Sequence, residues 1–436
     1  MPQRPRPHRP RKRSASPPAR LVELTIDQVG ARGDGIAALD GEAVFVPGTV
    51  AGDRVLARIE GRRGDGLIAA LVEVLVPAEA RAEPPCPHFG RCGGCTLQHM
   101  ADSAYAEWKR GLLLAPLARL RLEADIQPLV RVPPGSRRRA TFAFARHHGQ
   151  VLAGFNARAS HTVVDIGRCL LLEPALSALL PGLRTLLAPV VPEGGGDVTV
   201  TLTEGGLDVL VAAEARLDLF DRERLAAFAE SADLARLSWR RPDGGPPEPI
   251  ARRRPALVHF GTVAVEPPPG AFLQPTRGGE LAITERVMAA VGGLGPVADL
   301  FAGCGTFALP LAASGLTVHA VEGEEGPVRA LDAAARHAGL AIVAEVRDLA
   351  RRPLLADELR RFQAVVFDPP RAGAAAQAEQ LAASGPAVVV AVSCNPATLA
   401  RDLRVLVDGG YRIESLTPID QFPYSAHLET VAVLRR

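Results

Sequence analysis

The stretch Asp299-Leu-Phe-Ala-Gly-Cys-Gly-Thr-Phe307 decides the fold of the C-terminal part of this chain. It joins an apolar strand, expected at Val297–Phe301, to a glycine-rich turn and a helix. Further strands are expected at 318–322, 341–346, 363–367, 387–393, 411–418 and 429–435. Strands that alternate with helices predict an α/β fold with a doubly wound parallel sheet, in which ligands bind at the carboxyl ends of the strands.

The glycine-rich turn and the strand after it have the features of a cofactor site. Gly303 and Gly305 carry no side chain, so the backbone can approach a ligand closely. Glu322 ends the next strand, where an acid can accept hydrogen bonds from both hydroxyls of a ribose. A dinucleotide site has similar glycines, but the form D-L-F-x-G-x-G followed by V-E-G is more typical of S-adenosylmethionine binding. Cys304 is interpreted as a packing residue.

The sequence Phe367-Asp-Pro-Pro-Arg-Ala-Gly373 closes the fourth strand of this pattern. Asp368 is expected over the active site, and the two prolines after it stiffen the backbone. Enzymes that methylate exocyclic amines carry an aromatic residue after the second proline, and its ring stacks on the base. This chain has Arg371 at that position, which argues against an amine as the methyl acceptor.

Two candidate reactive side chains lie at strand ends. Cys394 follows the apolar strand at 387–393 and precedes a helix that starts near Pro396, whose N-terminus would stabilise a thiolate. The alternative is a buried core cysteine, which Asn395 and Pro396 directly after it disfavour. Glu429 opens the last strand, and such a carboxylate taken alone is usually a solvated cap.

Together these two side chains fit one reaction. Attack of a thiolate on carbon 6 of uracil breaks the conjugation of the ring and makes carbon 5 enolate-like, so that carbon 5 can take a methyl group from a sulfonium. A base must then remove the proton from carbon 5 before the thiol leaves. The sequence therefore predicts Cys394 as nucleophile and Glu429 as base in methylation of carbon 5 of a uridine, which must leave its stack to reach them.

The N-terminal half has a different pattern. Residues 21–78 alternate as about five short strands with turns at 30–35 and 61–66, a pattern that fits a small closed β-barrel and equally another small β-module. A helix is expected at about 101–122, and residues 125–270 mix strands and helices as in an α+β domain, with an exposed loop at Arg240–Pro255. The segments expected there are the strands Ala140–Arg146, Val198–Thr203 and Leu207–Ala213 and the helices Pro174–Leu187 and Arg222–Ser231.

The overall net charge of +2 hides a basic N-terminus. Residues 1–20 carry seven Lys and Arg, six Pro and no acid, which predicts a disordered basic arm. Such an arm could bind RNA phosphates through counterion release, or serve only as a solubilising tail. No apolar run reaches the roughly 18 residues that span a bilayer, and the N-terminus lacks the apolar core of a signal peptide. We expect a cytoplasmic protein of two or three domains.

Four of the six cysteines are spaced as in a metal site. Cys86, Cys92 and Cys95 form the pattern C-x5-C-x2-C, and Cys169 lies far downstream. Four thiolates suit either zinc or an iron–sulfur cluster. A zinc knuckle commonly has two C-x2-C pairs, whereas this chain has one.

The chain resembles the RNA 5-methyluridine methyltransferases, and among them the iron–sulfur 23S rRNA (uracil-5)-methyltransferases with a TRAM domain. The resemblance covers residues 21–436, and its strongest parts are Cys-Pro-His-Phe-Gly-Arg-Cys-Gly-Gly-Cys (86–95), the segment at 367–373 and Ser-Cys-Asn-Pro-Ala-Thr-Leu-Ala-Arg-Asp (393–402). It implies an OB-like TRAM barrel at 21–78 that binds RNA, a central α+β domain at 79–270 and a class I S-adenosylmethionine-dependent methyltransferase domain at 271–436.

The resemblance also implies the residues of the sites. It assigns Cys394 as nucleophile and Glu429 as proton acceptor, in agreement with the chemistry. It implies a [4Fe–4S] cluster held by Cys86, Cys92, Cys95 and Cys169. The positions that match the cofactor pocket are Gln274, Phe301, Thr306, Glu322, Asp348 and Asp368.

The expected substrate is 23S rRNA, because the tRNA-specific relatives usually lack both the TRAM domain and the cluster. The same reaction on tRNA is the first alternative. The second is a non-catalytic iron–sulfur protein that binds RNA, which an intact Cys394 and Glu429 oppose because binding alone requires neither. Neither a membrane nor an obligate protein partner is expected.

Overall fold

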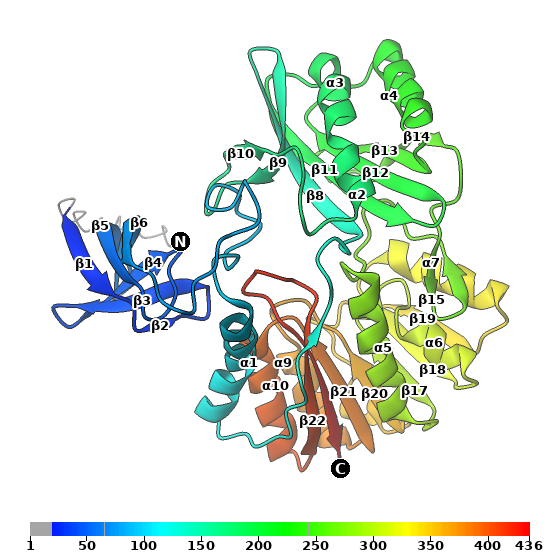
Figure 1. Cartoon of the computed structure of the whole chain (residues 1–436). Coiled ribbons are helices and arrows are strands. Elements are labelled where there is room, and N and C mark those ends of the chain that lie inside the picture. Colours follow the sequence, from blue (N-terminus) through cyan, green and yellow to red (C-terminus); the bar gives the residue numbers. More distant parts are fainter. Residues whose placement is uncertain (1–19, 65, 243) are drawn as a thin grey trace, which may run out of the picture. The chain divides into compact units, whose positions relative to one another are not determined.

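The computed structural model describes residues 20–64, 66–242 and 244–436, so the predicted basic arm at 1–20 lies outside them apart from Arg20. Contacts within the chain divide it into two units. One contains the residues up to Pro85 together with Thr96–Tyr105, and the other contains Cys86–Cys95 together with Ala106–Arg436. Figure 1 shows the helices and strands of both units.

The first unit contains a curled six-stranded sheet. Its strands are β1 (Leu21–Thr25), β2 (Gln28–Val29), β3 (Asp34–Leu39), β4 (Glu42–Pro47), β5 (Arg54–Arg63) and β6 (Gly66–Val76), in the order β1-β5-β6-β4-β3-β2. β1 and β2 lie at opposite edges, yet Ile26 and Asp27 between them donate backbone hydrogen bonds to the carbonyls of Asp53 and Ile36. The sheet therefore curls back on itself, as a barrel-like fold requires.

Two expected turns in this unit are partly strand. β3 begins at Asp34, inside the turn expected at 30–35, and β5 and β6 extend through most of the turn expected at 61–66. Gly35 has a different purpose from a turn glycine, because a Cβ at this position would overlap the hydroxyl of Thr49. A glycine inside a strand allows such a close approach of another side chain. Gly35 is therefore a strand glycine, although the sequence pattern placed it in the turn expected at 30–35.

The second unit contains an eight-stranded sheet in the order β19-β18-β17-β20-β21-β23-β22-β7, which confirms the predicted α/β fold class. Its strands are β7 (Val130–Arg131), β17 (Val297–Leu300), β18 (Val318–Glu322), β19 (Ile342–Val346), β20 (Ala364–Phe367), β21 (Val388–Ser393), β22 (Arg412–Asp420) and β23 (Glu429–Arg435). The sheet is mixed and not parallel throughout, because β23 runs antiparallel to both β21 and β22. Residues 421–428 join β22 to β23 without a crossover helix, and only antiparallel neighbours permit so short a connection.

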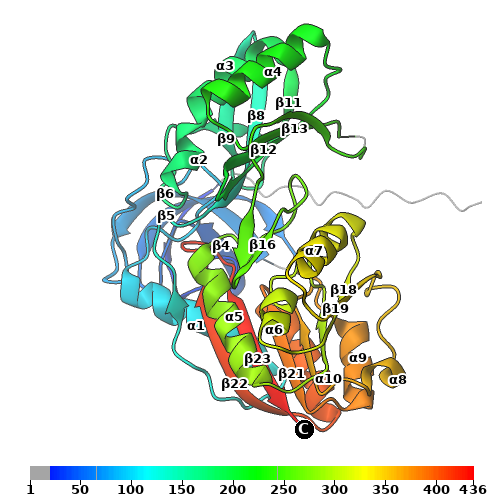
Figure 2. The same ribbon diagram turned by 90° about the vertical axis from the view of Figure 1, so that its right-hand side faces the viewer.

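Helices cover both faces of this sheet (Figures 1 and 2). In β20, Val365 and Phe367 contribute to one apolar cluster, whereas Ala364 and Val366 contribute to the cluster on the other face. The first cluster includes residues of α1 (Asp102–Arg119), α8 (Ala356–Leu359), α9 (Ala375–Ser384) and α10 (Pro396–Asp408). The second includes residues of α5 (Arg277–Val291), α6 (Ala308–Ala313) and α7 (Glu325–His337). The sheet is therefore doubly wound, as predicted.

Two elements that precede residue 271 belong to this sheet. The helix α1 packs Leu113 and Leu117 into the first apolar cluster. The short strand β7 adds an edge strand that runs parallel to β22, with Val130 paired to Ile419. Part of the segment 79–270 therefore completes the sheet formed by the C-terminal residues.

The same unit contains a second sheet of seven strands, in the order β10-β9-β8-β11-β12-β13-β14. Its strands are β8 (Arg139–His147), β9 (Gln150–Asn156), β10 (Val163–Asp165), β11 (Gly194–Thr203), β12 (Gly206–Ala213), β13 (Arg236–Arg240) and β14 (Glu248–Arg252). An apolar cluster is shared with the helices α2 (Pro174–Ala178), α3 (Leu180–Val190) and α4 (Leu219–Ser231). The strands β15 (Val258–Phe260) and β16 (Val263–Val265) form a separate pair.

Two expectations for this region were wrong in detail. The helix expected at 174–187 is divided into α2 and α3 at Leu179, next to Pro181 in the first turn of α3, where its missing N–H is tolerated. The loop expected at 240–255 contains the edge strand β14, and an edge position accommodates Pro249.

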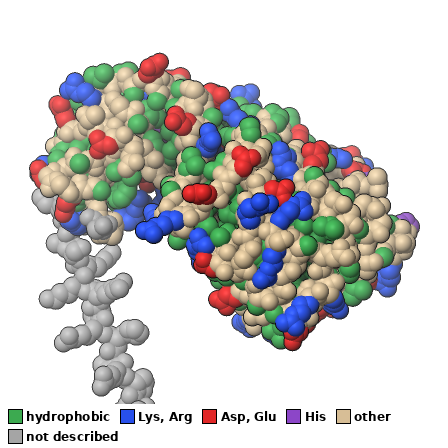
Figure 3. Space-filling view, turned by 90° about the horizontal axis from the view of Figure 1, so that it is seen from below, with side chains coloured by type: hydrophobic (Ala, Val, Ile, Leu, Met, Phe, Trp, Pro, Cys, Tyr) green, Lys and Arg blue, Asp and Glu red, His purple; other side chains and the backbone are tan. Residues whose placement is uncertain are grey.

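None of the helices in the described ranges is both long and apolar enough to cross a membrane. Figure 3 shows one face of the molecule, on which basic and acidic side chains are interspersed. This mixture agrees with the small net charge of +2 for the whole sequence.

Candidate active site

The predicted catalytic residues lie at one edge of the eight-stranded sheet. The strands β17, β20 and β21 run parallel and end side by side, and Asp368 and Cys394 directly follow β20 and β21. The strand β23 begins with Glu429 at the same edge, because it runs antiparallel to β21 and pairs Thr430 with Ser393. The reversed direction of β23 therefore brings Glu429 opposite Cys394.

Cys394 is partly exposed between β21 and α10. The side-chain oxygen of Asn395 caps α10 by accepting a hydrogen bond from the N–H of Ala397 at 3.2 Å. The expected thiolate does not result from this helix N-terminus: burial, together with the nearby carboxyl groups of Glu429 and Asp368, raises the pKa of the Cys394 thiol to about 11. The thiol is therefore protonated at neutral pH, and its reaction requires loss of that proton.

A chain of hydrogen bonds joins the two carboxyl groups of the site. Nε2 of Gln421 donates to Oε1 of Gln274 at 2.7 Å and to Oε2 of Glu429 at 2.9 Å. Nε2 of Gln274 donates to Oδ2 of Asp368 at 3.0 Å. Gln421, Gln274 and Glu429 are buried, with 0%, 3% and 3% of their surface exposed. Buried polar groups require such partners, so this network holds all four side chains in place.

Both carboxyl groups titrate near neutral pH. Burial and the neighbouring Asp368 raise the pKa of Glu429 to about 8, although the hydrogen bond from Gln421 opposes the rise. Burial raises the pKa of Asp368 to about 7, against the opposing hydrogen bond from Gln274. A carboxyl group with a pKa in this range is suited to accept or release a proton during a reaction.

Glu322 is held at the turn that follows β17. Its Oε2 accepts a hydrogen bond from the N–H of Gly303 at 3.0 Å, and its Oε1 accepts one from the N–H of Glu324 at 3.0 Å. Thr306 lies partly buried in the same turn. Asp348 follows β19, with half of its side chain exposed, and its Oδ1 accepts a hydrogen bond from the N–H of Ala350 at 3.0 Å. These acids lie at the ends of neighbouring strands, where a doubly wound sheet binds its ligands.

The two glycines of this turn have different functions. Both have positive φ angles, 55° for Gly303 and 98° for Gly305, which glycine adopts at no steric cost. A Cβ on Gly303 would meet no described atom within 4 Å, so the space beside it is open to a ligand. A Cβ on Gly305 would lie 2.9 Å from Cδ1 of Leu309. Gly305 therefore allows α6 to pack against the turn, and only Gly303 has the open space that was expected beside both.

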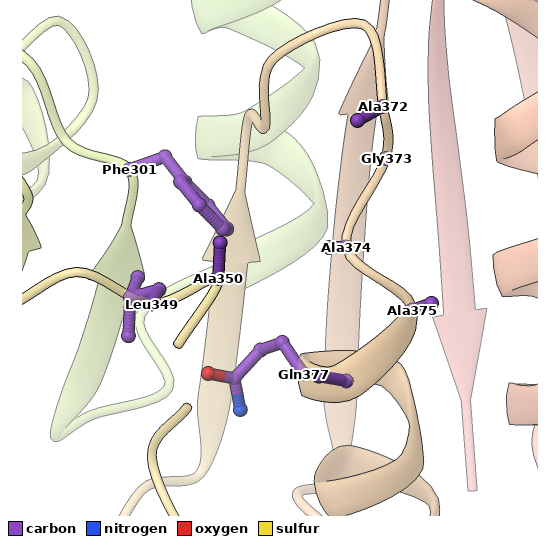
Figure 4. Close-up of a pocket in the computed structure, with 9 residues that line it drawn as sticks. Phe301, Leu349, Ala350, Ala372, Gly373, Ala374, Ala375 and Gln377 are labelled. Atoms are coloured by element: carbon purple, nitrogen blue, oxygen red, sulfur yellow. The ribbon is translucent and has the colours of Figure 1, made fainter. Parts of the chain in front are cut away.

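A cavity of about 250 Å³ lies between the ends of β17, β19 and β20 (Figure 4). It is lined by Phe301, Leu349, Ala350 and residues 372–377. Phe301 has a φ of 61°, a left-handed conformation that is rare for a bulky residue. The volume lies below the roughly 300–1,000 Å³ of typical ligand pockets, so the cavity suits one part of a larger cofactor.

The four cysteines expected to bind a cluster lie in one region. The thiols of Cys86, Cys92 and Cys169 affect one another electrostatically, and Arg137 is close enough to affect Cys95 and Cys169. None of the six cysteines, all of which lie in the described ranges, forms a disulfide bond. Within the described residues, no three Cys, His, Asp or Glu side chains are placed so that they could hold a metal ion.

Sequence reasoning missed two residues of this site. Gln421 joins Gln274 to Glu429, and its only sequence signal is its position eight residues before Glu429. Lys109 is fully buried and donates hydrogen bonds to Oδ1 of Asp420 at 2.8 Å and to the carbonyl of Phe422 at 3.2 Å. Its rarity was a usable signal, because the chain has only one other lysine.

The doubly wound sheet, the acid at the end of its second strand and the open space beside the glycine-rich turn form a site suited to a cofactor that contains a nucleoside. The fold agrees with that of a Pyrococcus abyssi tRNA (uracil-54, C5)-methyltransferase in complex with S-adenosyl-L-homocysteine, with a TM-score of 0.73. That likeness covers 95% of this chain and 100% of the other chain, at 23% sequence identity.

Sequence comparisons identify the family. Residues 268–436 match the tRNA (uracil-5-)-methyltransferase family. An uncharacterized RNA methyltransferase from Brucella suis biovar 1 is 45% identical over 418 residues, which cover 95% of this chain and 98% of the relative. The 23S rRNA (uracil(1939)-C(5))-methyltransferase of Halomonas elongata is 36% identical over 434 residues, which cover 94% and 89%. The chain belongs to the RNA (uracil-5-)-methyltransferases, enzymes that use S-adenosylmethionine to methylate carbon 5 of uracil in RNA.

Proposed function

We propose that this enzyme methylates a uridine of 23S rRNA through a covalent bond between Cys394 and carbon 6 of uracil, with Glu429 as the base. The observation that supports this mechanism is the position of Glu429 opposite Cys394, where its carboxyl group raises the pKa of the thiol. A structural cysteine would need no partner of this kind. The side chains of Gln274, Phe301, Thr306, Glu322, Asp348 and Asp368 would contact the cofactor.

The reaction proceeds in three steps with balanced atoms and electrons. The thiol of the partly exposed Cys394 loses its proton to solvent water, Cys394 Sγ bonds to carbon 6, and the electrons of the double bond move to carbon 5. Carbon 5 then takes the methyl group that S-adenosylmethionine would supply, and the electrons of the broken carbon–sulfur bond stay with the sulfur of the leaving S-adenosylhomocysteine. Glu429 removes the proton from carbon 5, so that the double bond re-forms and the bond between carbon 6 and sulfur breaks.

The pKa values predict how this reaction depends on pH. The Cys394 thiol has a pKa of about 11, so the fraction present as thiolate rises with pH throughout the neutral range. Glu429 accepts a proton only when ionised, and its pKa of about 8 makes the ionised fraction rise through the same range. Both groups therefore favour faster methylation at about pH 8 to 9 than at about pH 6 to 7.

RNA that contains 5-fluorouridine tests this mechanism. Fluorine cannot leave as a proton, so the methylated adduct should remain attached to the protein in the presence of S-adenosylmethionine. Cys394→Ala should form no adduct, whereas Glu429→Gln should still form it, because the base acts after methyl transfer. An adduct with Cys394→Ala, or none with an enzyme that methylates ordinary RNA, would refute the proposal.

Support for 23S rRNA as the substrate comes from the relative that is 36% identical along nearly the whole chain. The test compares transfer of labelled methyl groups to 23S rRNA fragments and to tRNA transcripts that lack modifications. Preferential methylation of tRNA would favour the alternative substrate. No transfer to any RNA by folded protein with bound cofactor would favour a binding protein without catalytic activity.

The N-terminal part of the proposal concerns RNA binding and a metal cluster. The curled sheet at 21–78 would be a TRAM-like RNA-binding barrel, residues 79–270 a central domain, and residues 271–436 the catalytic domain. Cys86, Cys92, Cys95 and Cys169 would hold a [4Fe–4S] cluster, because four thiols are a suitable donor set for it. The protein purified without oxygen should be brown and contain iron and sulfide, and a colourless protein that contains zinc would overturn this assignment.

A further inference from the structure

Gln421 makes contacts that the proposed chemistry does not yet use. It directly follows β22, and none of its surface is exposed. Its single amide nitrogen donates one hydrogen bond to Oε1 of Gln274 at 2.7 Å and one to Oε2 of Glu429 at 2.9 Å. A primary amide has two N–H donors, so both donors are used inside the active site.

The contacts around Gln421 determine which way its amide group points. A Cβ on Gly279, in α5, would lie 2.5 Å from Oε1 of Gln421 and 2.8 Å from its Cβ, so the side chain fills the space above this glycine. If the amide were reversed, its oxygen would face Oε1 of Gln274 and, in the ionised form of Glu429 that acts as the base, Oε2 of Glu429, so that acceptors would oppose acceptors. The orientation of Gln274 is set in turn by its hydrogen bond to Asp368.

This arrangement distinguishes the two oxygens of Glu429. Oε2 accepts the hydrogen bond from Gln421, whereas Oε1 is buried without a hydrogen-bond partner among the described residues. An unpartnered buried carboxylate oxygen is costly in the resting protein, and it is available to a proton that arrives with the substrate. A carboxyl group that could rotate freely would present either oxygen to the substrate.

We propose that Gln421 is a positioning residue for the base, which holds Oε2 of Glu429 so that Oε1 takes the proton from carbon 5. This inference rests on the proposed function of Glu429. It also explains why the chain of hydrogen bonds continues to Asp368, because Gln274 and Asp368 fix the position of the Gln421 amide. Gln421 would therefore act through Glu429.

The variant Gln421→Met tests this role, because methionine keeps the length of the side chain and removes both donors. Attack by Cys394 and methyl transfer precede the step that Gln421 supports, so the first methylation on each enzyme should proceed at an unchanged rate. Release of the product should be about 10- to 100-fold slower, the effect of losing a hydrogen bond to a charged group. The covalent protein–RNA complex should therefore accumulate with ordinary uridine.

The pH dependence supplies a second readout. The hydrogen bond from Gln421 lowers the pKa of Glu429, because it favours the charged form. Its removal should raise that pKa, so the increase of the product-release rate with pH should move to higher pH in Gln421→Met. A residue that only maintained the fold would reduce all rates without moving this profile.

Two further variants serve as a control and as an independent perturbation. Gln380→Met, in α9, removes an amide that accepts a hydrogen bond from the N–H of Ala356 at 3.0 Å, away from the reacting groups, and should change neither phase. Gly279→Ala places a methyl group against Gln421 and should slow product release in the same way as Gln421→Met.

The outcomes separate this inference from the proposed function. If the unaltered enzyme forms no adduct with 5-fluorouridine RNA, the covalent mechanism itself is refuted. If that adduct forms, the inference about Gln421 fails when Gln421→Met releases product at the normal rate. It also fails when the rates of the first methylation and of product release fall by the same factor. Slow release with a normal first methylation in both Gln421→Met and Gly279→Ala would support it.

Discussion

The buried Lys109 of α1 allows a test of what anchors residues 421–428, the loop that joins β22 to β23. Lys109 has no exposed surface, and its ammonium group contacts Asp420, of which 2% is exposed. It also donates hydrogen bonds to the carbonyl oxygens of Phe422 and His427. Asp420 is the last residue of β22, and Phe422 and His427 lie in the segment 421–428 that joins β22 to β23. Lys109→Met should therefore weaken the attachment of α1 to this loop.

The expected cost follows from the burial of both charges. Loss of one partner of a buried ion pair costs about 3–5 kcal/mol, because the other charge remains in the interior. Loss of a neutral hydrogen bond costs only about 0.5–1.5 kcal/mol, so the carboxylate of Asp420 dominates the effect. Asp420→Asn in the same chain should recover part of the lost stability, since it removes the charge that Lys109 neutralised.

Urea unfolding followed by tryptophan fluorescence measures this effect. The chain has two tryptophans, and Trp239→Phe leaves Trp108, next to Lys109 in α1, as the only reporter. Lys109→Met in this background should lower the midpoint without changing the slope. A loss below about 1 kcal/mol, the value of an exposed pair, would refute the reasoning, as would a double variant less stable than Lys109→Met.

Three further predictions concern the titrating base and the cofactor site. The pKa of Glu429 is about 8 in the folded protein against an ordinary 4.5, so its stabilising contribution is complete below pH 4.5 and is lost as the pH rises through 8. Glu429→Gln should therefore resist urea better than the unaltered protein at about pH 9 but not at about pH 4.5, and an equal difference at both values would contradict this. Glu322→Gln should weaken S-adenosylmethionine binding roughly 10- to 100-fold in calorimetry, and unchanged affinity would exclude Glu322 as a ligand. Gly305→Ala should lose about 1–3 kcal/mol of stability through crowding against Leu309, whereas Gly303→Ala should lose less stability but more cofactor affinity. The reverse ranking in thermal unfolding and binding would show that the two glycines were assigned wrongly.

Much of the site could be predicted from the sequence because its main residues sit at strand ends. The strands around Asp368 and Cys394 are buried on both faces and stand out as apolar runs, so the polar residues that follow them are conspicuous. Methylation of carbon 5 of uracil needs a nucleophile and a base, and this requirement connected Cys394 with Glu429. These assignments remain predictions for the assays above, whereas the fold class and the family are confirmed.

The features that were missed depend on residues far apart in the chain. Gln421 and Gln274 are separated by 147 positions, and Lys109 and Asp420 by 311, so no local pattern connects them. The same applies to the Cys394 thiol. The helix N-terminus next to it was visible in the sequence, but the two carboxyl groups and the burial that raise its pKa come from other strands.

The sequence by itself determined the doubly wound fold, the glycine-rich turn after β17 and the types of side chain that end the strands at the candidate site. These follow from periodicity, from glycines and prolines, and from residue types at strand ends, all of which are local properties. Only the tertiary structure decided the reversed direction of β23, the raised pKa values of Cys394 and Glu429, and the hydrogen bond from Gln421 to Glu429. Direction, burial and hydrogen bonding are set by which segments meet in space, and electrostatic effects add up over all of them.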